Sequence, residues 1–87
     1  MPGPKTAAAA ATDDPKVLFG RRLAQLRRQR SISQEQLALA IGMARSYLSG
    51  VERGQRNIAL ENICRLAAAL CVRPAELLEF EAPSPPK

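Results

Sequence analysis

Two short helical segments separated by a glycine limit the possible folds more than any other feature of this sequence. Residues 34–41 carry apolar side chains at helical spacing: Leu37, Ala38 and Ile41. Gly42 should end this segment, because glycine adopts with little strain the left-handed backbone that closes a helix. A second short helix is expected over 45–52, with Gly54 after it. Two short helices joined by so tight a turn form a helix-turn-helix.

The first of these helices has a clear start signal. Ser33 followed by Gln36 forms a capping box, in which the serine hydroxyl accepts from a free amide of the first turn. Ile32 before the cap and Leu37 after it stand at the positions of a hydrophobic staple. Ala38 is small where the second helix should cross the first, since a larger side chain would force the two apart.

Three further helices complete an all-α fold. One is expected over 15–30, capped by Asp14, and its inward stripe is Phe19, Leu23 and Leu26. A second covers 60–70, with an inward stripe of Leu60, Ile63, Leu66, Ala67 and Leu70. A third covers 74–80 and opens with a proline. We therefore expect one five-helix domain over 14–81, a flexible N-terminal arm over 1–13 and a proline-rich tail over 82–87.

Charge is unevenly distributed along the chain. Between residues 16 and 56 there are nine basic and two acidic side chains, a net charge of +7. Residues 57–81 carry two basic and four acidic side chains, a net charge of −2. A polyanion should therefore meet the first part of the domain, although a solvated arginine face is the common alternative.

Neither an enzyme nor a metal site is expected. The chain has no histidine, and no serine, cysteine or lysine stands beside a plausible base. No glycine-rich phosphate loop is present. Cys64 and Cys71 are too few for a zinc site and too far apart along one helix for a disulfide, so we expect two buried apolar side chains. We predict no metal and no cofactor.

No membrane association is expected either. No stretch approaches the roughly 20 apolar residues that span a bilayer. Residues 2–11 lack the apolar core of a secretory signal, so a cytoplasmic location is predicted.

The region from Ser33 to Gly54 resembles the lambda-repressor-like (XRE) family of helix-turn-helix regulators. The resemblance rests on Ser33-Gln34-Glu35-Gln36-Leu37-Ala38, then Gly42, then Arg45-Ser46-Tyr47-Leu48-Ser49-Gly50-Val51-Glu52-Arg53-Gly54. It extends over about 19–78. The segment 45–53 followed by Arg56-Asn57 is most similar to the controller proteins of restriction-modification systems. The family implies a compact five-helix domain that binds double-stranded DNA and regulates transcription.

The second helix of the motif should lie in the major groove, with its first residues nearest the base edges. Base readout is predicted for Arg45, Ser46 and Tyr47. Arg45 is the strongest candidate, because its planar fork can bond guanine O6 and N7 together, unless it contacts only phosphate. Tyr47 has the alternative of a half-buried core residue. Contacts to the DNA backbone are predicted for Gln34, Ser49, Arg53, Arg56 and Asn57. The resemblance to controller proteins implies that Arg56 also contacts a base.

The family resemblance also implies structural features. It pairs Arg27 with Glu52 in a salt bridge between the first and third helices, as a partly buried carboxylate requires. Three positions depart from the family pattern: Ala44 and Ala59 replace capping residues, and Cys71 replaces a helix-ending glycine. Each departure should weaken the local helix end.

We expect a homodimer on an operator with two half-sites, because one helix-turn-helix covers too little DNA for tight specificity. The predicted dimer interface is Leu77, Leu78 and Phe80, which look like more apolar side chains than a short helix can bury. No small-molecule effector is expected. The alternative function is an antitoxin-like or adaptor protein whose main role is to bind a partner protein, and RNA binding is a weaker third possibility.

Overall fold

The computed structural model describes residues 14–80, so the predicted N-terminal arm and proline-rich tail lie outside the described residues. The described part of the chain contains five helices and no strand, which confirms the predicted all-α fold. The helices are α2 (Pro15–Gln29), α3 (Gln34–Ile41), α4 (Arg45–Glu52), α5 (Leu60–Leu70) and α6 (Pro74–Leu77). In this same part, no helix is long and apolar enough to cross a membrane.

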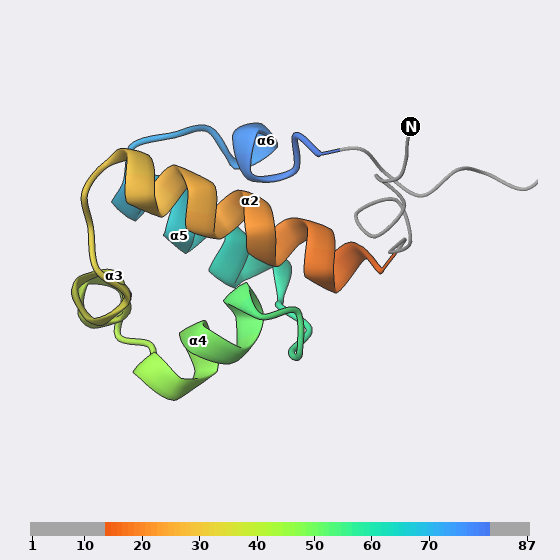
Figure 1. The fold of residues 1–87 in the computed structure, drawn as a ribbon. Coiled ribbons are helices and arrows are strands. Elements are labelled where there is room, and N and C mark those ends of the chain that lie inside the picture. The colour runs from red at the N-terminus through yellow and green to blue at the C-terminus, as the bar shows by residue number, and fades with distance from the viewer. Residues whose placement is uncertain (1–13, 81–87) are drawn as a thin grey trace, which may run out of the picture.

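The longest of the described helices, α2, lies between α4 and α6. In Figure 1, α6 lies on one side of α2 and α4 on the other, and α2 contacts both. The short helix α3 contacts α4 and α5, and α5 continues to α6. α4 therefore packs on its neighbours along one side and leaves its other side exposed.

A single apolar core joins all five helices. Its largest fully buried side chains come from every helix: Leu23, Leu37, Leu48, Val51, Leu66, Leu70 and Leu77. Leu48 and Val51 lie three residues apart, on the stripe of α4 that faces the core. Their burial fixes which side chains of α4 point outward.

The helix ends follow the local signals of the sequence. The Asp14 carboxylate accepts from the Lys16 amide at 2.9 Å, and this hydrogen bond lowers the pKa of Asp14. Ser33 and Gln36 form the predicted capping box, with hydrogen bonds of 3.0 and 2.8 Å. Gly42 ends α3 in the left-handed conformation, with a φ of 67°. The local signals therefore set the bounds of α3 as predicted.

The last helix is shorter than predicted, ending at Leu77 and not at Phe80. The Arg22 side chain of α2 donates to the Glu76 carbonyl at 2.7 Å. This carbonyl is the one that the amide of residue 80 would need if the helix continued. The Phe80 amide turns instead to the Leu78 carbonyl at 3.0 Å. The Glu76 carbonyl also accepts from the Glu79 amide at 3.3 Å, so its two acceptor positions are filled, one of them by a side chain 54 positions away, and α6 ends early.

Three predictions about burial on α5 are wrong. Leu60 is largely exposed at the first position of the helix, so the apolar stripe begins one turn later at Ile63. Cys64 and Cys71 are also exposed. Cys64 lies outside the inward stripe. Cys71 lies after the last turn, in the left-handed conformation with a φ of 59°, which turns it away from the core.

Candidate nucleic-acid interface

A buried ion pair holds α4 against α2. Arg27 donates to both carboxylate oxygens of Glu52, at 2.6 and 3.0 Å, and also to the Ile32 carbonyl at 2.8 Å. Only 10% of the Arg27 side chain and 5% of the Glu52 side chain are exposed. The hydrogen bonds that Arg27 donates to Glu52 raise the pKa of Arg27. The predicted structural salt bridge is present, in the bidentate form that fixes orientation as well as distance.

Gln34 joins this network from the start of α3. Its side-chain amide donates to Glu52 Oε1 at 2.8 Å, so a single carboxylate links α2, α3 and α4. We predicted Gln34 as a phosphate contact. Its side-chain NH₂ group is instead hydrogen-bonded to Glu52 within the protein. Its backbone amide lies in the first turn of α3, where amides have no acceptor within the helix. The contact with Glu52 could not be inferred from sequence, because the two residues come together only in the folded chain.

The outer face of α4 presents the predicted base-reading residues to solvent. Arg45 and Ser46 are exposed in the first turn, and within residues 14–80 neither side chain has a hydrogen-bond partner. With Ser49 and Arg53 they line a shallow open depression of about 350 Å³. Four of the predicted DNA-contacting side chains therefore share one surface, three of them on α4 and Arg53 directly after it.

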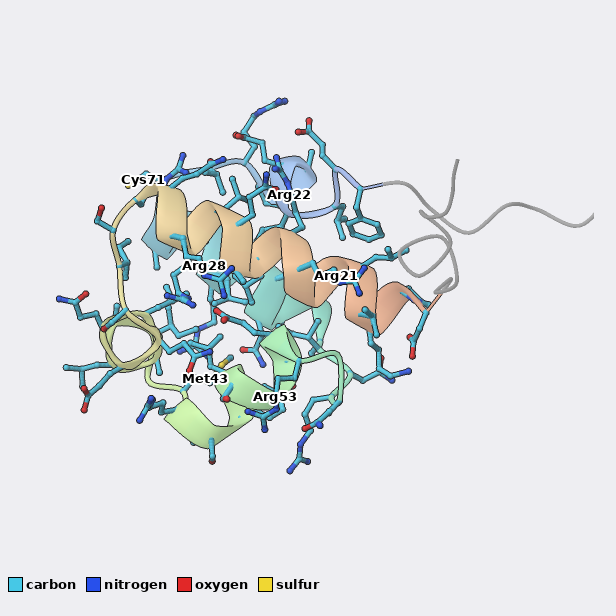
Figure 2. The ribbon with its side chains drawn as sticks, in the orientation of Figure 1. Arg21, Arg22, Arg28, Met43, Arg53 and Cys71 are labelled. Atoms are coloured by element: carbon cyan, nitrogen blue, oxygen red, sulfur yellow. The ribbon has the colours of Figure 1, made fainter. Side chains whose placement is uncertain are left out.

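Arg53 is held at the end of this surface. Its guanidinium donates to Ser49 Oγ at 2.5 Å and to Gln55 Oε1 at 3.3 Å. In Figure 2 it lies over α4, on the opposite side of α2 from Arg22. Arg53 pairs with no carboxylate in the described part of the chain, so its charge remains available to an anion.

Tyr47 is half-buried and packs against the core, as in the alternative to base readout that the sequence left open for this residue. Its hydroxyl donates to the Asn57 carbonyl at 2.7 Å. The predicted base contact remains a prediction, but the hydroxyl already has a partner within the protein. Arg56 and Asn57 are both exposed in the segment after α4.

Close contact between α2 and α4 depends on Gly20, which the sequence reasoning missed. A Cβ atom built on Gly20 would lie 2.4 Å from the Val51 carbonyl oxygen and 2.6 Å from that of Glu52. No residue with a Cβ atom fits there unless one of the two helices moves. The available signal was a glycine in the middle of a long helix, where it costs helix stability and needs a packing reason.

The exposed positive charge gathers on the first part of the chain, as its charge distribution predicts. Seven exposed arginines make no ion pair within residues 14–80: Arg65 of α5 and, in the first part of the chain, Arg21, Arg28, Arg30, Arg45, Arg53 and Arg56. Arg21 and Arg28 lie along α2 (Figure 2), and the last three belong to α4 and the segment after it. By contrast, Arg22 and Arg73 pair with Glu79 and Glu76 near α6.

The three predicted dimer residues differ in their surroundings. Leu77 is fully buried in its own chain, so its side chain cannot face a partner, and the prediction is wrong for this residue. Leu78 is 48% exposed, and Phe80 is half-buried against the core. Both line a small, mainly apolar hollow of about 160 Å³ with Phe19, Ile58 and Ile63, and Lys16, Arg56 and Asn57 line it as well. Of the three, only Leu77 is fully buried in the core of its own chain.

Known proteins share this arrangement. The model of the helix-turn-helix family matches residues 23–77, more than half of the chain. Control protein C.BamHI of Bacillus amyloliquefaciens is 43% identical over 70 residues, covering 79% of this chain and 86% of that protein.

Two solved structures extend the comparison. The restriction-modification controller protein C.AhdI of Aeromonas hydrophila is 55% identical, covers 71% of this chain and 94% of its own, and superposes with a TM-score of 0.70. The controller protein C.Esp1396I, solved as a tetramer in complex with its natural 35 base-pair operator, is 25% identical, covers 74% of this chain and 84% of its own, and has a TM-score of 0.67.

The family match includes the capping box of α3, the turn at Gly42 and the whole of α4, and the buried Arg27–Glu52 pair holds these helices together. The chain therefore belongs to the XRE-type helix-turn-helix family of DNA-binding transcriptional regulators.

Proposed function

We propose that the chain binds double-stranded DNA sequence-specifically as a homodimer and regulates transcription from the bound operator. α4 lies in the major groove, where Arg45 and Ser46 contact base edges. Gln34, Ser49, Arg53, Arg56 and Asn57 contact the DNA backbone on either side. Controlling genes of a restriction-modification system is the regulatory role that the similarity to C.BamHI and C.AhdI favours.

One observation carries the assignment of Arg45. It is exposed at the first position of a helix whose opposite side is buried, and no group within residues 14–80 neutralises or bonds its guanidinium. The buried Arg27–Glu52–Gln34 network fixes the helix that carries it. An arginine fixed in this way can meet guanine with both of its donors, which is a specific contact and not only an electrostatic one.

The homodimer is supported by the size of the unit. A single helix-turn-helix buries too little surface for tight specificity, and such units pair on half-sites about 34–36 Å apart. The tetrameric C.Esp1396I on its operator is a related protein that assembles on DNA in more than one copy. We place the two-fold contact at the apolar hollow beside Leu78 and Phe80, because a self-complementary patch gives a closed dimer.

A selection from random-sequence duplexes by the wild-type chain would provide the operator, and Arg45→Ala would then test the reader. We expect about 5- to 150-fold weaker binding to the selected duplex and a relaxed preference at one base pair per half-site. Binding to an unrelated duplex should change much less. Fluorescence anisotropy titrations at one fixed salt concentration measure both.

The matched control is Arg73→Ala, which removes the same charge from an exposed arginine next to Glu76. It should leave both affinities nearly unchanged, since Arg73 lies beyond the basic part of the chain. If Arg45→Ala weakens selected and unrelated duplexes equally, Arg45 contacts only phosphate and the proposed readout is wrong.

A further inference from the structure

The segment after α4 is bound to that helix before any DNA is present. The Gln55 amide donates to the Gly50 carbonyl at 2.8 Å, and the Tyr47 hydroxyl donates to the Asn57 carbonyl at 2.7 Å. We call residues 55–58 the reading loop, since they contain two predicted DNA contacts. The two hydrogen bonds attach the reading loop at both ends, one through the backbone and one through a side chain.

Arg56 lies between these two attachments. A Cβ atom at Gly50 would be 2.9 Å from Arg56 Cγ and 3.6 Å from its Nε, so the Arg56 stem lies directly over the missing side chain. This packing buries Gly50 while the Arg56 residue as a whole remains exposed. The direction in which Arg56 leaves the protein is therefore set by the position of the loop on α4.

Tyr47 is suited to hold that position. Its ring packs against the core, so a rigid side chain with few torsions carries the hydroxyl to a fixed place. The hydrogen bond from this hydroxyl is the only one that Asn57 makes within residues 14–80. Without it, the far end of the reading loop would have no polar attachment to the rest of the described structure.

We propose that Tyr47 is a positioning residue: its hydroxyl fixes the reading loop so that Arg56 and Asn57 are presented to DNA in their binding geometry. This inference rests on the proposed function and changes the role we predicted for Tyr47 from base reader to support of its neighbours. A loop fixed in advance loses less conformational freedom on binding, which favours the complex. The effect acts through Arg56 and Asn57, not through a contact of the phenol with a base.

Tyr47→Phe tests this inference, because it keeps the packed ring and removes only the hydroxyl. In the free protein, ¹⁵N relaxation should show lower order parameters for residues 55–58 and unchanged values for Leu48 and Val51 in α4. Exchange of the Gln55 amide should become several-fold faster. These readouts need no DNA. They therefore test whether the Tyr47 hydroxyl holds the reading loop even if the wild-type chain selects no duplex and the proposed function fails.

A double-mutant cycle tests whether Tyr47 acts through Arg56. On the selected duplex, Tyr47→Phe should weaken binding about three- to tenfold, the range of one neutral hydrogen bond, without changing the dependence on salt. Arg56→Ala should weaken binding and also lower the salt slope. In the Arg56→Ala background, Tyr47→Phe should have a smaller effect than in the wild type, because of the two residues that it positions only Asn57 remains.

Two results would overturn the inference. Unchanged order parameters in residues 55–58 would show that the hydroxyl does not hold the loop. A Tyr47→Phe variant with an ordered loop and a relaxed preference at one base pair would show that the hydroxyl reads a base directly.

Discussion

At the scale of single residues, Gly20 and Glu52 together determine where the recognition helix lies. The missing side chain of Gly20 lets the α2 backbone meet the last turn of α4, and the Glu52 carboxylate at that turn binds Arg27 and Gln34. One contact sets the distance between the helices and the other sets their orientation. Since Arg45 is carried by the same rigid helix, both act on the position of the predicted reader.

Gly20→Ala should destabilise the protein by about 3 kcal/mol or more, at the upper end of the cost of overpacking, because the new methyl group would meet backbone carbonyls that cannot move independently. For a domain of this size, the melting temperature should fall by roughly 12 °C or more. Thermal unfolding followed by circular dichroism measures the change.

Gly50→Ala is the matched control, since it adds the same methyl group inside a neighbouring helix. There the new atom would meet only the flexible Arg56 side chain, which can move aside. Stability should change by less than about 1 kcal/mol, because the gain in helix propensity offsets the displacement. Equal destabilisation by the two variants would mean that close packing of α2 on α4 is not what requires Gly20.

At the scale of the helices, α3 and α4 begin in different ways. In α3, the amide of Gln36 in the first turn donates to the Ser33 hydroxyl. In α4, the equivalent amide of Tyr47 turns back to the Ala44 carbonyl at 3.1 Å, since Ala44 has no side-chain acceptor. α5 begins like α4, after Ala59. Both helices thus start without the usual side-chain cap, as does α6, whose cap residue Arg73 has no side-chain acceptor.

Ala44→Ser and Ala59→Ser should each stabilise the protein by about 0.5–1 kcal/mol, because both positions have the extended backbone of a cap residue. The double variant should gain nearly the sum, since the two caps share no partner. Denaturant unfolding at constant m-value measures each gain. If neither substitution raises the midpoint, the alanine caps are not a source of instability.

The helix bounds were predictable wherever the signal is local. The capping box at Ser33 and the glycine at position 42 act within a few residues, and α3 has the predicted range. The end of α6 was not predictable, because the Arg22 side chain that ends it comes from the other end of the chain. The same holds within the candidate site. The family resemblance implied the pairing of Arg27 with Glu52, but not the bonds of Glu52 to Gln34 or of Tyr47 to Asn57.

At the scale of the whole molecule, α4 and the proposed dimer contact are separate, but Arg56 and Asn57 of the predicted DNA-binding surface line the same hollow as Leu78 and Phe80. Except for Arg65 in α5, the exposed arginines without an acidic partner within residues 14–80 belong to α2, to α4 and to the segments that follow them. The proposed dimer contact lies at the end of α6, where Leu78 is exposed beside Glu79. No residue of α4 lines this hollow, so two copies can pair while both recognition helices stay free to enter successive major grooves.

Leu78→Glu should drive the proposed dimer apart, because it replaces an apolar contact with a charge beside Glu76 and Glu79, and across a two-fold axis these charges face their own copies. Sedimentation at tens of micromolar should show a dimer for the wild type and a monomer for the variant. Leu39→Glu is the control, since Leu39 is 81% exposed on α3 and takes no part in the proposed contact. A wild-type chain that stays monomeric, both free and on a duplex with two half-sites, would overturn the dimer, and a monomer produced only by Leu39→Glu would move the interface to α3.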